Sequence, residues 1–150
     1  MIKGIIFDLD GVLVDTKDIH FEALNTSLEK IKSKNLISFD DHSKNFDGLP
    51  TSKKLIILKN RSWIKESQFK KIKILKQKLT EKILKKKIKK NSHIIKIFKS
   101  LKKKYKIGVA TNAVRATLNI CIKNIGIKNY INYEISNEDV VNSKPHPEIY

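Results

Sequence analysis

Two aspartates close an apolar stretch near the start of the chain, in the sequence FDLDGVLVDT. Residues 2–7 are mostly apolar, which is typical of a buried strand. Asp8 and Asp10 follow two positions apart, and alternate side chains of an extended chain point the same way. The two carboxylates are therefore expected side by side at the carboxyl end of a strand, where open α/β sheets place their active sites.

Two neighbouring carboxylates repel each other unless a cation lies between them or one of them stays protonated. Burying such a pair at the end of an apolar strand is also costly without a function. A functional site is therefore a better explanation for Asp8 and Asp10 than a purely structural role.

Further strand and helix patterns alternate in the second half of the chain. Strands are predicted over residues 107–110 and 131–135. Helices are predicted over residues 94–101 and 113–124, and Gly126 is expected to end the second one. Strand, helix, strand, helix and strand in this order predict an α/β fold with a parallel sheet.

A long segment between the first two strands has helical patterns only. Apolar residues recur at helical intervals over residues 17–31 and 69–84, and Thr51 is expected to begin a helix that runs through Leu58. Residues 39–50 are polar and rich in turn formers. We therefore predict an α/β core made of residues 1–16 and 91–150, with an inserted all-helical domain over residues 17–90.

The chain of 150 residues has a net charge of +17, which raises the question of nucleic-acid binding. Nearly all its cations are lysines, and Arg61 and Arg115 are the only arginines. Sequence-specific contacts to nucleic acids favour arginine, and the lysines over residues 70–90 alternate with apolar helix positions. A solvated basic face is therefore favoured over a nucleic-acid interface, and the charge would help to attract phosphorylated substrates.

The apolar start of the chain is interrupted by Asp8 and Asp10, so it is neither a secretory signal nor a membrane span. No membrane partner is expected. The single cysteine, Cys121, is interpreted as a small core residue. Nothing requires an oxidising compartment, so the default expectation is a cytoplasmic protein.

Three segments carry a resemblance to a known family. The sequence DLDGVL at residues 8–13 resembles the first motif of the haloacid dehalogenase superfamily of phosphohydrolases, and the continuation at residues 14–23 is similar to its β-phosphoglucomutase-like and phosphoglycolate phosphatase-like branch. VATN at residues 109–112 resembles the second motif, and NSKPHPEIY at residues 142–150 resembles the third. The three motifs stand in the order of the family.

The resemblance implies a Rossmann-like core with a helical cap. It also implies magnesium-dependent hydrolysis of a small phosphorylated metabolite, such as a sugar phosphate or phosphoglycolate, through an aspartyl-phosphate intermediate. Asp8 would be the nucleophile and Asp10 the general acid and then the general base. Thr111 would bind phosphoryl oxygens, and it could also cap the helix that starts at Ala113. Lys144 would neutralise developing charge, while Asp8 and the backbone carbonyl of Asp10 would hold Mg²⁺.

The resemblance implies substrate contacts with less support. The cap histidine of mutase-like members corresponds to His20, for which an ordinary helix position is an equal alternative, and a solvated side chain is the favoured alternative for Lys76. The mutases have an arginine in a cap loop where this chain has Ser52 and Lys53, which argues against bisphosphorylated-sugar chemistry. His42, His93 and His146 lack metal-ligand spacing and are given no catalytic role. The complete set of expected substrate contacts is Gly11 and Asn112 through main-chain N–H groups, His20, Gly48, Thr51, Lys76 and Arg115.

Members of this superfamily continue after the lysine motif with a helix, a fourth strand and an acidic pair that completes the magnesium site. We therefore expect the core of the 150 residues to be incomplete at its C-terminal end, with an unpaired edge on the first strand. Low solubility and little phosphatase activity are expected of these residues alone. The alternatives to a hydrolase are a phosphosugar mutase, an inactive fragment, or a chain whose sheet a second chain completes.

Overall fold

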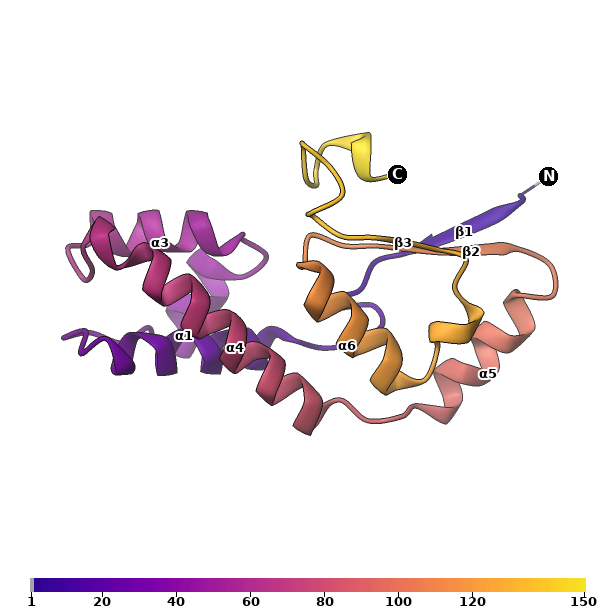
Figure 1. Cartoon of the computed structure of the whole chain (residues 1–150), viewed down its shortest axis with the longest axis horizontal. Coiled ribbons are helices and arrows are strands. Elements are labelled where there is room, and N and C mark those ends of the chain that lie inside the picture. The colour runs from indigo at the N-terminus through magenta and orange to yellow at the C-terminus, as the bar shows by residue number, and fades with distance from the viewer. Residues whose placement is uncertain (1) are drawn as a thin grey trace. The chain divides into compact units, whose positions relative to one another are not determined.

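The computed structural model of the protein describes residues 2–150. Its internal contacts divide the chain into a core unit, Met1–Thr16 with Leu84–Tyr150, and a helical unit, Lys17–Ile83 (Figure 1). The predicted inserted domain extends to residue 90, whereas the helical unit ends at Ile83, inside a helix. From Leu84 onward the chain makes its contacts within the core unit.

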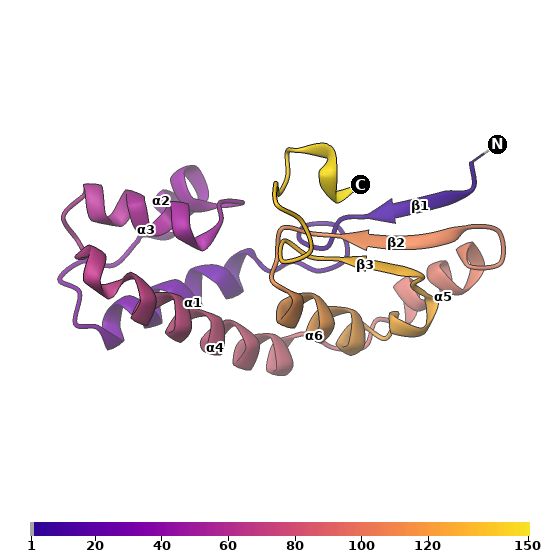
Figure 2. The same ribbon diagram turned by 45° about the horizontal axis from the view of Figure 1, so that its top comes forward.

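The core unit contains a parallel sheet of three strands in the order β1-β2-β3. The strands are β1 (Gly4–Phe7), β2 (Lys106–Ala110) and β3 (Tyr133–Ile135), as Figure 2 shows. Ile5 pairs with Ile107, and Gly108 pairs with Tyr133. The predicted α/β fold class is confirmed. Because the strands are parallel, their carboxyl ends meet at one edge of the sheet.

Helices α5 (Ser92–Leu101) and α6 (Arg115–Ile125) cover one face of this sheet (Figure 1). Asn91 caps α5 by accepting hydrogen bonds from the N–H groups of the first turn. Gly126 ends α6 with a φ of 89°, as predicted, and a Cβ there would lie 2.7 Å from a methyl group of Ile95. Phe98, Leu118 and Ile122 are among the fully buried side chains of this layer.

Among residues 2–150, the segment after β3 crosses above the other face of the sheet in Figure 1, and no helix labelled there covers this face. This face carries a depression of about 430 Å³ whose lining includes Ile6, Gly108, Ile135 and Tyr150. β1 lies at one edge of the described sheet, where an unpaired edge was predicted. Side chains such as Ile6, which is 49% exposed, therefore face solvent on a strand of apolar sequence.

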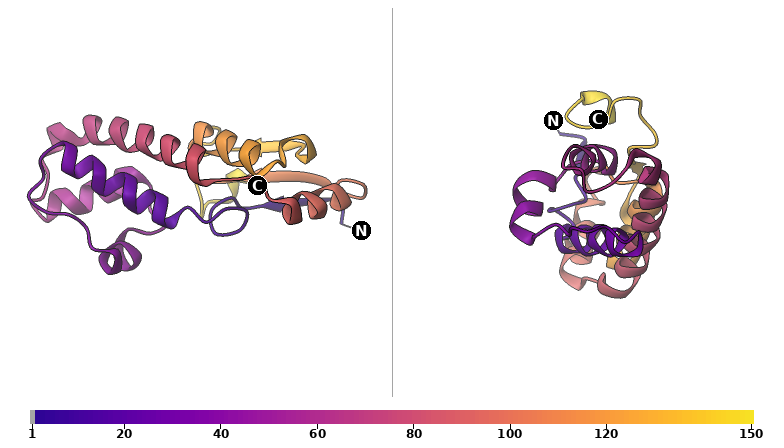
Figure 3. Two further views of the ribbon diagram at one scale, coloured as in Figure 1. Left: turned by 90° about the horizontal axis from the view of Figure 1, so that it is seen from below. Right: turned by 90° about the vertical axis from the view of Figure 1, so that its left-hand side faces the viewer.

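The helical unit is built from amphipathic helices around a hydrophobic cluster. Helices α1 and α4 lie side by side in Figures 2 and 3. Residues 39–46, predicted as turns, form two short helical segments instead, because the Ser38 side chain accepts the N–H of Asp41 and caps the first of them. The helical segments are α1 (Lys17–Lys30), α2 (Phe39–Asp41), a π-helical turn (His42–Phe46), α3 (Thr51–Asn60) and α4 (Phe69–Lys87). Short 3₁₀ turns lie at Glu66–Gln68 here and at Lys128–Tyr130 and Pro147–Ile149 in the core unit.

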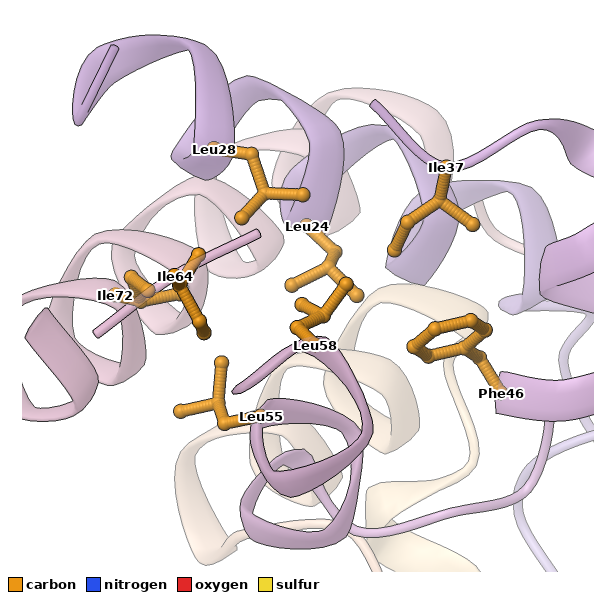
Figure 4. Close-up of a cluster of buried hydrophobic side chains, with 8 residues drawn as sticks. All are labelled: Leu24, Leu28, Ile37, Phe46, Leu55, Leu58, Ile64 and Ile72. Atoms are coloured by element: carbon orange, nitrogen blue, oxygen red, sulfur yellow. The ribbon is translucent and has the colours of Figure 1, made fainter. Parts of the chain in front are cut away.

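Side chains from several of these segments meet in the cluster that Figure 4 shows. Leu24 and Leu28 come from α1, and Leu55 and Leu58 come from α3. All four are fully buried, so the cluster accounts for much of the burial that stabilises the helical unit. The other members are Ile37, Phe46, Ile64 and Ile72.

Cys121, the one cysteine of the chain, is fully buried in α6. Burial raises the pKa of its thiol to about 12. The prediction of a core residue is confirmed. None of the helices in residues 2–150 has the length and apolar character needed to cross a membrane.

Candidate active site

Asp8 is the first residue after β1, and its carboxylate forms an ion pair with Lys144. The Lys144 ammonium lies 3.0 Å from Asp8 Oδ1, which also accepts the N–H of Leu9 at 2.7 Å. The Asp8 side chain is nevertheless 42% exposed. A carboxylate that is held through one oxygen and open to solvent is suitably placed to attack a bound molecule.

Lys144 is held at both its side chain and its backbone. Its ammonium donates to the carbonyl of Ala110, the last residue of β2, at 2.8 Å. The side chain of Asn112 accepts the N–H of Lys144 at 2.9 Å and donates to its carbonyl at 3.2 Å. The ring of Tyr150 lies 5.5 Å from the ammonium. Asn112 therefore positions Lys144, a role that its place next to Thr111 in the sequence did not reveal.

Asp10 is held by two buried threonine hydroxyls. Thr16 donates to Oδ1 of Asp10, and Thr111 donates to Oδ2 at 3.4 Å. The Thr111 oxygen also accepts the N–H of Ala113 at 3.0 Å, although α6 begins only at Arg115. Thr111 thus contacts both the acidic pair and the turn before the helix. The contact of Thr16 was not predicted, because a threonine before a helix is usually read as a cap.

The N–H of Gly11 was expected to bind phosphoryl oxygens, but in this structure it donates to the carbonyl of Val14 at 2.8 Å. Gly11 adopts a φ of 77°, which lets the chain turn back after the aspartates. The main chain of Gly11 is therefore engaged in this turn, and a phosphoryl contact through the N–H of Asn112 stays a prediction.

Arg115, also expected near the substrate, forms an ion pair with Asp139 and donates to the carbonyl of Glu134 at 3.0 Å. The hydrogen bond that Arg115 donates to Asp139 raises the pKa of Arg115, and it correspondingly lowers the pKa of Asp139. These contacts fasten the start of α6 to the segment after β3. A substrate contact of Arg115 stays a prediction.

The remaining expected contacts lie in the helical unit. His20 on α1 is partly buried, and its Nδ1 lies 3.5 Å from the ammonium of Lys76 on α4. Lys76 is only 7% exposed, so the favoured alternative of a solvated lysine was wrong. Its helix face packs inward beside His20. Gly48, with a φ of 69°, is exposed, and Thr51 begins α3.

Oxygen donors of the kind that Mg²⁺ prefers are present at the end of β1. Asp8 and Asp10 supply two carboxylates, which fit this metal in kind. Residues 2–150 do not, however, gather three or more histidine, cysteine, aspartate or glutamate side chains into a group that could hold a metal ion. The described residues thus supply two carboxylates of the kind that Mg²⁺ prefers, and no complete set of metal ligands.

The sequence matches the model of the haloacid dehalogenase-like hydrolases over residues 5–150. The chain belongs to this family. The predicted membership and the enzyme class are confirmed, since the match includes all three motifs and nearly the whole chain.

Individual relatives agree with this assignment. A phosphorylated carbohydrates phosphatase from Thermotoga maritima is 28% identical over 151 residues, which cover 99% of this chain and 67% of that protein. The fold resembles that of a β-phosphoglucomutase from Clostridium difficile, with a TM-score of 0.75 and 24% identity over 99% of this chain and 68% of the other. It also resembles CbbY from Rhodobacter sphaeroides, solved with phosphate, with a TM-score of 0.83 and 18% identity over 100% and 70% of the two chains.

Proposed function

We propose that this protein is a magnesium-dependent phosphatase that hydrolyses small phosphorylated carbohydrates through an aspartyl-phosphate intermediate. The observation that carries the proposal is the convergence of Asp8, Asp10, Thr111 and Lys144 at the carboxyl ends of β1 and β2. The name of the Thermotoga maritima relative supports the substrate class.

In the first step, an oxygen of Asp8 attacks phosphorus and the bond from phosphorus to the ester oxygen breaks. Asp10 gives its proton to the leaving alcohol. Lys144, which pairs with Asp8 at 3.0 Å, balances the charge that builds on the phosphoryl oxygens. The hydroxyls of Thr16 and Thr111 hold both oxygens of Asp10 and so limit where its proton can go.

In the second step, Asp10 has lost its proton and acts as a base. It takes a proton from a water molecule whose oxygen attacks phosphorus. The bond between phosphorus and Asp8 breaks, phosphate leaves, and Asp10 is protonated again. Asp8 and Asp10 return to their starting states, as a catalytic cycle requires.

Magnesium would supply positive charge between the Asp8 carboxylate and the phosphate dianion, which otherwise repel each other. Asp8 and the backbone carbonyl of Asp10 would hold it. A phosphosugar mutase would use the same two aspartates and hand the phosphoryl group to a second sugar phosphate. Ser52 and Lys53, in place of the arginine of the mutases, favour transfer to water.

The test is phosphate release by the protein expressed from its native gene, with a panel of sugar phosphates and phosphoglycolate. We expect turnover that EDTA abolishes and Mg²⁺ restores. Asp8→Asn should lower turnover at least about 10⁴-fold, because it removes the nucleophile. Asp18→Asn changes an exposed aspartate of α1 in the same way and should leave turnover unchanged. Undiminished turnover in Asp8→Asn would contradict the proposed mechanism.

A further inference from the structure

A carboxylate that the proposed mechanism does not use closes the segment that carries Lys144. Glu148 follows Lys144 in the chain and lies in the 3₁₀ turn at Pro147–Ile149. Its Oε1 accepts the N–H of Val141 at 2.7 Å, and its Oε2 accepts the N–H of Asn142 at 2.9 Å. The side chain of Asn142 donates to the same Oε2 at 3.0 Å. Glu148 thus joins the residues before Lys144 to the turn after it.

These hydrogen bonds favour the ionised form of the Glu148 side chain. The N–H groups of Val141 and Asn142 lower the pKa of Glu148, and the Asn142 side chain and the charge of His146 lower it further, against the opposing effect of desolvation. Hydrogen bonds to an ionised acceptor are about twice as strong as those between neutral groups. The carboxylate is therefore able to hold two main-chain N–H groups in a stretch where the Val141 side chain is 91% exposed.

The turn that carries Glu148 is itself held in place. The side chain of Ile149 is fully buried. The N–H of Glu148 donates to Nδ1 of His146 at 3.2 Å, and the N–H of His146 donates to the carbonyl of Ser143 at 3.2 Å. Lys144 therefore lies inside a closed loop of chain whose two ends meet at one carboxylate.

Lys144 reaches the active site from this loop. Its ammonium pairs with Asp8 at 3.0 Å and donates to the carbonyl of Ala110 at 2.8 Å. The Asn112 side chain contacts the backbone of Lys144 itself, whereas Glu148 contacts the two residues that precede Ser143. A lysine ammonium is a point charge on a flexible stem, so its location depends on how firmly the backbone beneath it is held.

We infer that Glu148 is a positioning residue of the active site, whose carboxylate closes the loop around Lys144 and so holds the Lys144 ammonium beside Asp8. The inference rests on the proposed function for the reaction in which Lys144 takes part. A displacement of about 1 Å in a reacting group can lower a rate about 10²-fold. Because both oxygens of Glu148 accept N–H groups, a glutamine there would turn its own NH₂ group toward a donor. The sequence placed Glu148 in the third motif and gave it no role.

The first test is steady-state kinetics of Glu148→Gln with a sugar phosphate, in the protein expressed from its native gene. We expect kcat to fall about 10-fold and KM to change less than about twofold, because the misplaced ammonium acts on charge that develops in the transition state. In a Lys144→Met background, Glu148→Gln should have no further effect, since no ammonium is left to position. Val141→Ala keeps the N–H donor and changes only an exposed side chain, so it should retain the parent kcat.

A second test follows Lys144 without turnover. The parent and Glu148→Gln are treated with limiting acetic anhydride, and peptide mass spectrometry compares acetylation of Lys144 with that of the exposed Lys104. The Lys144 side chain is 16% exposed and paired with Asp8, which protects it because acetylation needs a neutral amine. We expect the ratio of Lys144 to Lys104 acetylation to rise at least about threefold in Glu148→Gln, as the ion pair loosens.

The two tests separate this inference from the proposed function. Absence of turnover in the parent would refute the proposed function, and the acetylation ratio would still decide the role of Glu148. An unchanged ratio in Glu148→Gln, or a loss of kcat that persists in full in the Lys144→Met background, would overturn the inference. Asn142→Ala, which removes one of the three hydrogen bonds to Glu148, is the second variant if Glu148→Gln does not fold, and the ratio should rise in it too.

Discussion

The two units differ in which titratable side chains they bury and in the groups that contact them. In the core unit, Asp8 has an ammonium beside it and Asp10 accepts two hydroxyls, so groups of opposite or complementary character meet. In the helical unit, Lys54 and Lys76 are buried, and burial lowers the pKa of His20, with the charges of both lysines lowering it further. The described contacts of the core unit join groups of complementary character, whereas burial of neutral imidazole rings is the main feature of the helical unit.

This difference predicts whether a substitution in each unit changes catalysis or folding stability. Removing a charge from the core unit should affect catalysis more than folding, because the Asp8 carboxylate that Lys144 pairs with is 42% exposed and lies at the end of a strand. Removing apolar or titratable groups from the helical unit should affect folding, because its polar groups lie against its hydrophobic cluster. The following tests run from the largest expected effect to the smallest.

Lys144→Met tests the core unit first. We expect turnover of a sugar phosphate to fall about 10²- to 10³-fold, since the variant removes the charge that stabilises the phosphoryl oxygens. Its folding should change little. Lys104→Met, at an exposed position, is the matched control. Turnover within twofold of the parent would show that the pairing of Lys144 with Asp8 is structural only.

Leu58→Ala tests the helical unit. Leu58 is fully buried in the hydrophobic cluster, so its truncation should lower the free energy of unfolding by about 2–5 kcal/mol in denaturant titrations. Ile56→Ala changes a residue of the same helix that is 50% exposed and should cost less than about 1 kcal/mol. Equal losses in the two variants would mean that the cluster does not dominate the stability of this unit.

The pH dependence of stability tests the buried histidines. The pKa of His42 is about 4 in the folded protein and 6.5 ordinarily, so the unfolded chain binds this proton more tightly. Stability is complete above pH 6.5 and falls as the pH drops to about 4, by about 3 kcal/mol for this residue. His42→Leu should flatten the profile in this window, whereas His93→Gln, at an exposed position, should not. A parent profile that is flat between pH 4 and 6.5 would contradict the burial of a neutral His42.

Asn112→Ala has the smallest expected effect. The Asn112 side chain forms hydrogen bonds with both backbone groups of Lys144. Loss of this side chain should lower kcat about 10-fold, because the Lys144 ammonium is then held less firmly in position. In a Lys144→Met background the same substitution should have no further effect, because nothing is left to position. Asn119→Ala, at an exposed position of α6, is the control. Additive losses in the double variant would mean that Asn112 acts independently of Lys144.

The placement of Asp8 and Asp10 could be predicted from strand geometry, because both follow β1 at the carboxyl end of a parallel strand. Thr111, which follows β2, was expected from its resemblance to a family motif. Lys144 was found through its motif, since no local pattern places a residue so far along the chain beside Asp8. Gly126 was predicted from its helix-ending preference alone.

The helical unit could be predicted only as helices. Nothing local distinguishes Lys54 and Lys76 from the many exposed lysines, because their burial depends on how three helices pack. The roles of Thr16 and Asn112 depend in the same way on loops whose course the sequence does not specify. Helical periodicity thus predicts which face is apolar, but not which cation lies beneath it.

The single cysteine offers a separate view of the two units. Cys121 is buried in α6, and its thiol, with a pKa of about 12, is almost entirely protonated at neutral pH. An alkylating reagent needs an exposed thiolate, so it can react only when the core unit opens. The helical unit contains no cysteine, so the reagent does not modify it. The rate of alkylation of Cys121 therefore reports the opening of the core unit and not that of the helical unit.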